Sequence, residues 1–158
     1  MLKRKNYLSL KEIIRKKKIN NLRQGLIGGL SVKTCKKHGD SIVIDYVKNY
    51  RDYVRKNPNP KIDKNYYQNY WDGGMAYKAL IKGALMAFNK YSDVNRVMVV
   101  AYDKDGKYAI NIGRKYLFDL IVSENENMIN AAYNTKIKEK LINEKIVRFK
   151  KKYGFFNI

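Results

Sequence analysis

The sequence predicts one α+β domain that is mostly helical, with five or six helices around a central apolar helix and one antiparallel β-hairpin. Three observations predict it: most of the 158 residues have helical spacing of apolar side chains, residues 73–90 are apolar on most sides, and residues 94–112 change to strand-like spacing. Apolar residues make up 45% of the chain, which is enough to build a core. The length leaves no room for two sizeable cores.

Residues 1–24 are predicted to form a basic arm that contains a helix. Ser9 followed by Glu12 fits a capping box, and Gly25 suits the position just after a helix. The apolar residues in between do not gather into one stripe, and residues 1–24 hold nine basic groups and one acidic group. Such a helix buries little and presents charge on most sides, so it is interpreted as an arm for phosphates, with a solvated surface helix as the alternative.

The clearest amphipathic helix is predicted from Asp40 or Ser41 to Lys56. Helical spacing brings one set of apolar side chains to one side, with Ile44 as the outlier. That set is Ile42, Val43, Tyr46, Val47, Tyr50, Tyr53 and Val54. The tyrosines share their side with valines, so they are interpreted as core residues rather than as a surface for bases. Pro58 and Pro60 end the helix.

Residues 61–71 bring four aromatic side chains close together. They suggest either a surface for bases or a neighbouring subunit, or a short helix or loop that its rings pin to the core. Asp72 is the predicted N-cap of the central helix, residues 73–90. Small residues form one side of that helix and bulky residues another, so it is expected in the middle of the fold or in an oligomer interface.

The β-hairpin is predicted within residues 94–112. Residues 97–101 are β-rich, and Tyr108, Ile110 and Ile112 alternate with other residues. Asp105-Gly106 between these two runs is a strong hairpin signal. A two-stranded ribbon is marginal alone, so it is expected to pack on the central helix or on another chain.

Helical spacing returns in the last third of the chain. Helices are predicted over 114–122, over 125–133, and from Asn134 or Thr135 to Tyr153, before Gly154. The predicted organisation is a basic N-terminal arm or helix (1–24), one globular domain (25–153) and an apolar tail (154–158). Such a tail usually needs a groove, on its own domain or on a partner. The candidate partner-binding residues are Tyr66, Tyr67, Tyr70, Trp71, Phe155, Phe156 and Ile158.

The formal charge of +20 is the strongest functional signal. Thirty-four Lys and Arg stand against fourteen Asp and Glu, and self-repulsion of that size requires a counter-charge nearby. A polyanion is therefore the expected partner, and DNA is favoured over RNA. The candidate nucleic-acid-binding residues are Lys3, Arg4, Lys5, Lys11, Arg15, Lys16, Lys17, Lys18, Arg23, Lys33, Lys36 and Lys37.

Catalytic and metal-binding motifs do not emerge from the sequence. Cys35 and His38 have metal-ligand spacing, but they are the only Cys and His, so they cannot complete a zinc site and are interpreted as loop residues. Lys33-Thr34 lacks the glycine spacing of a phosphate-binding loop. The single histidine has no marked carboxylate partner for a nucleophilic triad. We expect no enzyme activity, no cofactor and no metal.

These observations favour a non-enzymatic structural component of a nucleic-acid-containing assembly. The first interpretation is a phage or viral virion protein of the capsid or head–tail connector type, oligomeric and in contact with other subunits. The alternatives are a ribosome-like RNA-binding protein, a small DNA-binding regulator that reads DNA with helix 41–56, and a metal-dependent nuclease. A single cysteine, no long apolar run and no signal-type apolar core predict a cytoplasmic or virion location, without secretion or membrane insertion.

Overall fold

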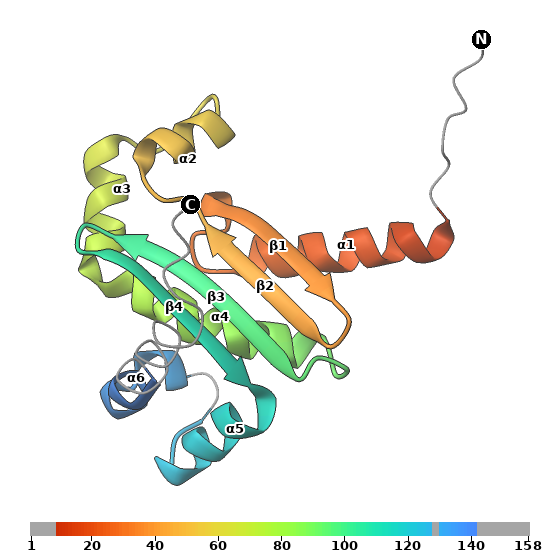
Figure 1. Cartoon of the computed structure of the whole chain (residues 1–158). Helices are drawn as coiled ribbons and strands as arrows, with labels where there is room; N and C mark the ends of the chain where they lie inside the picture. Colours follow the sequence, from red (N-terminus) through yellow and green to blue (C-terminus); the bar gives the residue numbers. More distant parts are fainter. Residues whose placement is uncertain (1–8, 128–129, 142–158) are drawn as a thin grey trace.

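The computed structural model of the protein describes residues 9–127 and 130–141 (Figure 1). The strands are β1 (Val32–His38), β2 (Ser41–Tyr46), β3 (Arg96–Asp103) and β4 (Gly106–Gly113). The α-helices are α1 (Leu10–Gly25), α2 (Tyr50–Lys56), α3 (Lys64–Tyr70), α4 (Ala76–Lys90), α5 (Arg114–Ser123) and α6 (Thr135–Leu141). Three short turns of helix complete the order: η1 (Gly29–Ser31), η2 (Trp71–Met75) and η3 (Ala131–Tyr133).

The four strands form one mixed sheet in the order β1-β2-β3-β4. The β1–β2 and β3–β4 pairs are antiparallel hairpins, whereas β2 and β3 run parallel and are joined through α2, α3 and α4. The prediction of a mostly helical α+β fold is confirmed. The expected arrangement around a single hairpin is wrong, because a second hairpin, β1–β2, extends the sheet.

Residues 41–56 do not form one helix. Ser41–Tyr46 is strand β2, and the helix begins only at Tyr50, where the Asn49 side chain accepts a hydrogen bond from the Asp52 amide at 3.1 Å. Alternate residues of β2 are buried, which is the period of a strand. Ile44, the outlier of the predicted helix, is fully buried and pairs with Val99 of β3.

Helix α4 packs on one face of the sheet, and α1 lies behind the same face (Figure 1). Nine residues of α4 are buried. Gly83 allows the close approach, since a Cβ there would lie 3.4 Å from the Val99 side chain and 3.6 Å from that of Ile44. The main core therefore lies between α4 and the side chains that point from the strands towards it.

Asp72 does not cap the central helix. The chain passes from α3 through η2 into α4, with Gly74 at a φ of +91° inside η2. The Asp72 carboxylate instead accepts the backbone amide of Lys104 at 2.8 Å, in the turn between β3 and β4. This carboxylate therefore ties η2, the turn before α4, to the hairpin, a tertiary contact that replaces the predicted local one.

The described part of the C-terminal third, up to residue 141, is less helical than expected. The helix predicted over 114–122 is present as α5, but of the residues that the structure describes within 125–133 only those of η3 are helical. Helix α6 starts at Thr135, and the Asn134 side chain accepts the amide of Ile137 at 3.1 Å. The predicted continuation to residue 153 and the tail 154–158 lie outside the described residues.

Candidate nucleic-acid interface

The capping box predicted at the start of α1 is confirmed. The Ser9 hydroxyl accepts the Glu12 amide at 3.3 Å, and the Glu12 carboxylate accepts the Ser9 amide at 2.7 Å. The hydrogen bond from the Ser9 backbone lowers the pKa of Glu12, and the charges of Lys16 and Arg15 lower it further. The only acidic group of this helix is therefore held at its first turn, where a negative charge interacts favourably with the helix dipole.

Helix α1 is anchored to the body at its C-terminal half. Leu22 is buried in the core and Ile19 packs partly against it. In the first two turns, by contrast, Leu10, Ile13 and Ile14 are 72%, 50% and 56% exposed. Figure 1 shows this N-terminal half of α1 standing out from the fold. The helix is thus presented to the surroundings rather than packed along its length.

The basic side chains of α1 are almost all available. Helix α1 holds six basic residues and one acidic residue. The exposed basic side chains are those of Lys11, Arg15, Lys16, Lys17 and Lys18. Within residues 9–127 and 130–141, no ion pair involves any of them. Arg23 is half-buried, and Lys3, Arg4 and Lys5 lie outside the described residues.

Tyr91, which sequence reasoning missed, connects α1 to β1. The Lys18 ammonium lies 4.5 Å from the centre of the Tyr91 ring, and the Lys37 ammonium lies 5.9 Å from it. Lys37 also donates to the Asp93 carboxylate at 2.8 Å, and this hydrogen bond lowers the pKa of Asp93. Basic side chains of two distant segments therefore meet over one aromatic ring, a contact that their sequence positions do not indicate.

The β1 lysines are less free than those of α1. Lys37 is paired with Asp93, and Lys33 lies 3.9 Å from the Asp45 carboxylate. Lys36 is exposed and is paired in register with Val43, on the face of the sheet away from α4. The three predicted lysines of β1 therefore do not form one surface with α1; only Lys37 reaches it.

The aromatic group of residues 66–71 is mostly internal. Tyr67 and Trp71 are 6% and 4% exposed and belong to the core, Tyr70 is half-buried, and Tyr66 alone is 58% exposed. The Trp71 ring stands edge-on to Tyr46 with 5.2 Å between centroids. These positions agree with rings that pin α3 to the core. The other candidate partner-binding residues, Phe155, Phe156 and Ile158, lie outside the described part of the chain.

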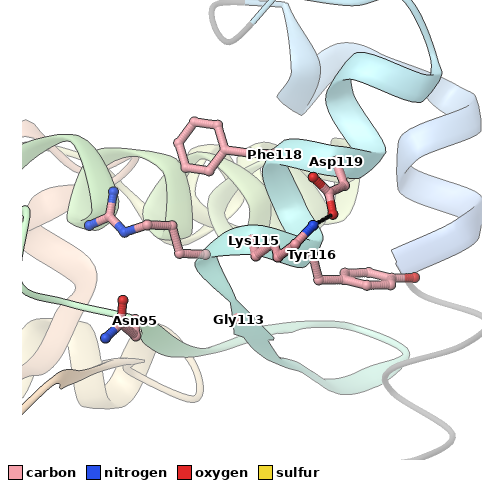
Figure 2. A pocket seen from close by; sticks show the side chains of 7 residues that line it. Asn95, Gly113, Lys115, Tyr116, Phe118 and Asp119 are labelled. Carbon is pink, nitrogen blue, oxygen red and sulfur yellow. Dashed lines mark hydrogen bonds and ion pairs between the residues drawn. The ribbon is translucent and has the colours of Figure 1, made fainter.

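An open pocket lies where β4 meets α5 (Figure 2). Figure 2 shows the Lys115 ammonium directed to the Asp119 carboxylate, and the two lie 2.5 Å apart. Asp119 is the only carboxylate in the lining, and it is already paired. The lining therefore offers no pair of carboxylates.

Cys35 and His38 are strand residues and not the loop residues expected from the sequence. Three positions apart in β1, they point to opposite faces of the sheet, so their spacing does not make a pair of ligands. Burial raises the pKa of the Cys35 thiol to about 11, which keeps it protonated and unreactive. No group of three or more metal-binding side chains was found in the described residues.

Comparisons with protein-family models, with curated proteins and with solved structures found no match to this chain. Among the helices of residues 9–127 and 130–141, none has the length and apolar content needed to cross a membrane.

Proposed function

We propose that this protein is a non-enzymatic, nucleic-acid-binding component of a larger assembly, and that α1 contacts the phosphates. The observation that carries the proposal is a helix anchored at one end whose five exposed basic side chains have no ion-pair partner in the described residues. Phosphate is the counter-charge that such a helix suits, because each Lys or Arg that neutralises a phosphate releases condensed counterions.

The row that we assign to phosphate contact consists of Lys11, Arg15 and Lys18. At positions i, i+4 and i+7 they lie along one side of the helix over about 10 Å. The row lies on the same side of the helix as Leu22, which is buried. Its last member, Lys18, therefore contacts the Tyr91 ring, which Lys37 of β1 also approaches. Lys16 and Lys17 lie on other sides, so one rigid helix cannot bring all five charges to one strand.

The assembly that we propose is a phage or virus particle, with this chain as a capsid or head–tail connector subunit, located in the cytoplasm or the virion and binding DNA rather than RNA. The large net charge supports a site next to packaged nucleic acid. A protein neighbour is supported by the exposed apolar side chains of Leu10, Ile13 and Ile14. Contact with phosphate alone would leave this apolar patch exposed to water, whereas a neighbouring subunit would cover it.

One alternative loses its structural basis. A small regulator would have read DNA with a helix over residues 41–56, but Ser41–Tyr46 is a strand inside the sheet. The remaining helix, α2, has seven residues and contacts α3. The ribosome-like alternative is separated by comparing duplex DNA with RNA of the same length, and the nuclease alternative by incubating DNA with the protein and magnesium.

The test measures the salt dependence of duplex DNA binding by fluorescence anisotropy. Changing Lys11→Gln, Arg15→Gln and Lys18→Gln together should lower the slope of log K against log salt by about 2 to 3, similarly for unrelated sequences. The matched control, Lys61→Gln, Lys64→Gln and Lys104→Gln, removes the same charge from exposed positions elsewhere and should change the slope by less than about 1. Equal effects of the two triple variants, or no effect of either, would refute the role of α1.

A further inference from the structure

Another pocket lies between the last turns of α1 and the short turn η1. It has a volume of about 310 Å³ and is lined by Asn20, Arg23, Gln24, Gly29 and Leu30. Of the described residues that line it, none is acidic, and three carry an amide or a guanidinium group. The α1 side of this pocket is therefore rich in hydrogen-bond donors. We call it the α1–η1 pocket.

Two positive charges meet at the α1–η1 pocket. Arg23 lines it, and the Lys56 ammonium of α2 lies 3.4 Å from the carbonyl oxygen of Leu30, another lining residue. Both basic side chains are half-buried, and neither belongs to an ion pair within the described residues. Burial lowers the pKa of Lys56, and the charge of Arg23 lowers it further. Because like charges repel at this half-buried position, a bound anion would stabilise both.

The backbone acceptors beside these two cations already have donors. The Leu30 carbonyl accepts the side-chain amide of Asn57 at 3.1 Å, a shorter hydrogen bond than that from Lys56. The carbonyl of Arg23 itself accepts the backbone amide of Leu26 at 3.3 Å. An ammonium has three donors and a guanidinium has five, so both side chains keep donors for a ligand.

The pocket continues a row of side chains on α1. Lys16, Asn20 and Arg23 occupy positions i, i+4 and i+7, and so lie along one side of the helix over about 10 Å. At about 3.6 residues per turn, this pocket row lies about 140° around the helix axis from the first row, the one proposed to contact phosphate. Ile19 and Leu22, which pack on the core, lie between the two rows. The body of the protein therefore separates them.

We propose that the α1–η1 pocket binds a phosphate group of nucleic acid between Arg23 and Lys56, and that Lys16 contacts the same strand. The inference rests on the proposed function, to which it adds a second contact on another side of α1. One DNA strand carries about three phosphates over 10 Å of duplex, so the pocket row matches a polymer of phosphates. A single carboxylate from a protein neighbour would occupy the pocket and leave Lys16 without a partner.

The first test places negative charge on the wall of the pocket in the full chain. Asn20→Asp with Gln24→Glu alters two exposed positions of α1, and the matched control, Asn65→Asp with Gln68→Glu, makes the same change at exposed positions of α3. Fluorescence anisotropy measures the affinity for duplex DNA at one salt concentration. The pocket pair should weaken binding by at least about ten-fold through repulsion of phosphate, and the control pair by about three-fold or less.

The second test removes the two cations. Arg23→Gln with Lys56→Gln should lower the slope of log K against log salt by about 1, which corresponds to one phosphate. This decrease should add to that of the triple variant of the first row, because the two rows do not share a phosphate. In urea unfolding without DNA, inorganic phosphate should raise the midpoint more than chloride at equal ionic strength does, and the cation variant should lose most of that excess.

The outcomes separate this inference from the proposed function. Equal losses of affinity in the acidic pair and its control would refute the pocket, while a lower slope for the first-row variant would still support α1. If neither row alters DNA binding, both proposals fail. Stabilisation by inorganic phosphate that the cation variant removes, with DNA affinity unaltered in the acidic pair, would assign the pocket to a small phosphate compound and overturn the nucleic-acid contact. If the acidic pair does not fold, the slope of the cation variant decides.

Discussion

Arg114 joins the start of α5 to the end of α4, and its replacement is the most informative stability test. Its Nε donates to the carbonyl of Val94 at 2.8 Å, and one terminal nitrogen donates to those of Phe88 at 3.0 Å and Tyr91 at 2.5 Å. Its guanidinium also lies 4.9 Å from the Phe88 ring centre. The last carbonyls of a helix have no partner inside it, so this side chain supplies donors that the backbone lacks.

The magnitude follows from these contacts. Three hydrogen bonds from a charged donor at a partly buried site contribute about 1 kcal/mol each, and the ring contact adds about 0.5 to 1 kcal/mol. We therefore expect Arg114→Ala to lower the free energy of unfolding by about 3 to 4 kcal/mol. Arg114→Lys keeps the charge but cannot reach all three carbonyls, so the loss should be about 2 kcal/mol.

The neighbouring residue provides the matched control. Lys115 pairs with Asp119, but their side chains are 88% and 62% exposed, so Lys115→Ala should cost about 0.5 kcal/mol or less. Urea unfolding followed by circular dichroism measures all three variants at one pH. The reasoning would be refuted if Arg114→Ala cost no more than Lys115→Ala, or if Arg114→Lys were as stable as the unchanged protein.

Two further predictions concern Gly28 and Asp45. A Cβ at Gly28, which has a φ of +58°, would lie 2.8 Å from the Trp71 ring, so Gly28→Ala should lower the free energy of unfolding by about 2 to 4 kcal/mol. Gly39 has a φ of +56° but open space around it, so Gly39→Ala should lower it by only about 1 kcal/mol. Equal losses of the two variants in urea unfolding would show that the Trp71 ring moves aside. Because burial raises the pKa of Asp45, the folded state binds its proton more tightly, and stability should fall as pH rises from the ordinary Asp pKa of 3.8 through the raised one. Asp45→Asn should remove that fall and make the protein more stable at neutral pH; an Asn variant less stable at pH 7 would contradict the direction of the shift.

Local patterns predicted some elements well. The capping box at Ser9 and Glu12 and the turn residues at Asp105-Gly106 depend on neighbours a few positions apart, so the sequence alone contains them. The β2 strand was missed because Ile42, Val43 and Tyr46 fit a helical spacing, whereas the residues that the structure buries are Ile42, Ile44 and Tyr46. The buried outlier Ile44 was the available signal for period two.

Tertiary contacts explain the remaining errors. Asp72 has the properties of an N-cap, but its carboxylate is used by the Lys104 amide, 32 positions further along the chain. In the candidate interface, the basic residues of α1 were predicted, whereas Tyr91 was not, because only the fold brings it under Lys18. The pairing of Lys37 with Asp93 could not be predicted for the same reason.

The outer position of β1 has a consequence for self-association. Among the strands that the structure describes, none pairs with its outer edge, and such edges can recruit further strands and grow into fibrils. Lys33, Lys36 and Lys37 along β1, with the irregular register between Val32 and Thr34, oppose that growth. Copies of this chain can therefore be crowded together with little risk of strand pairing at the β1 edge, provided that they contact one another through their helices.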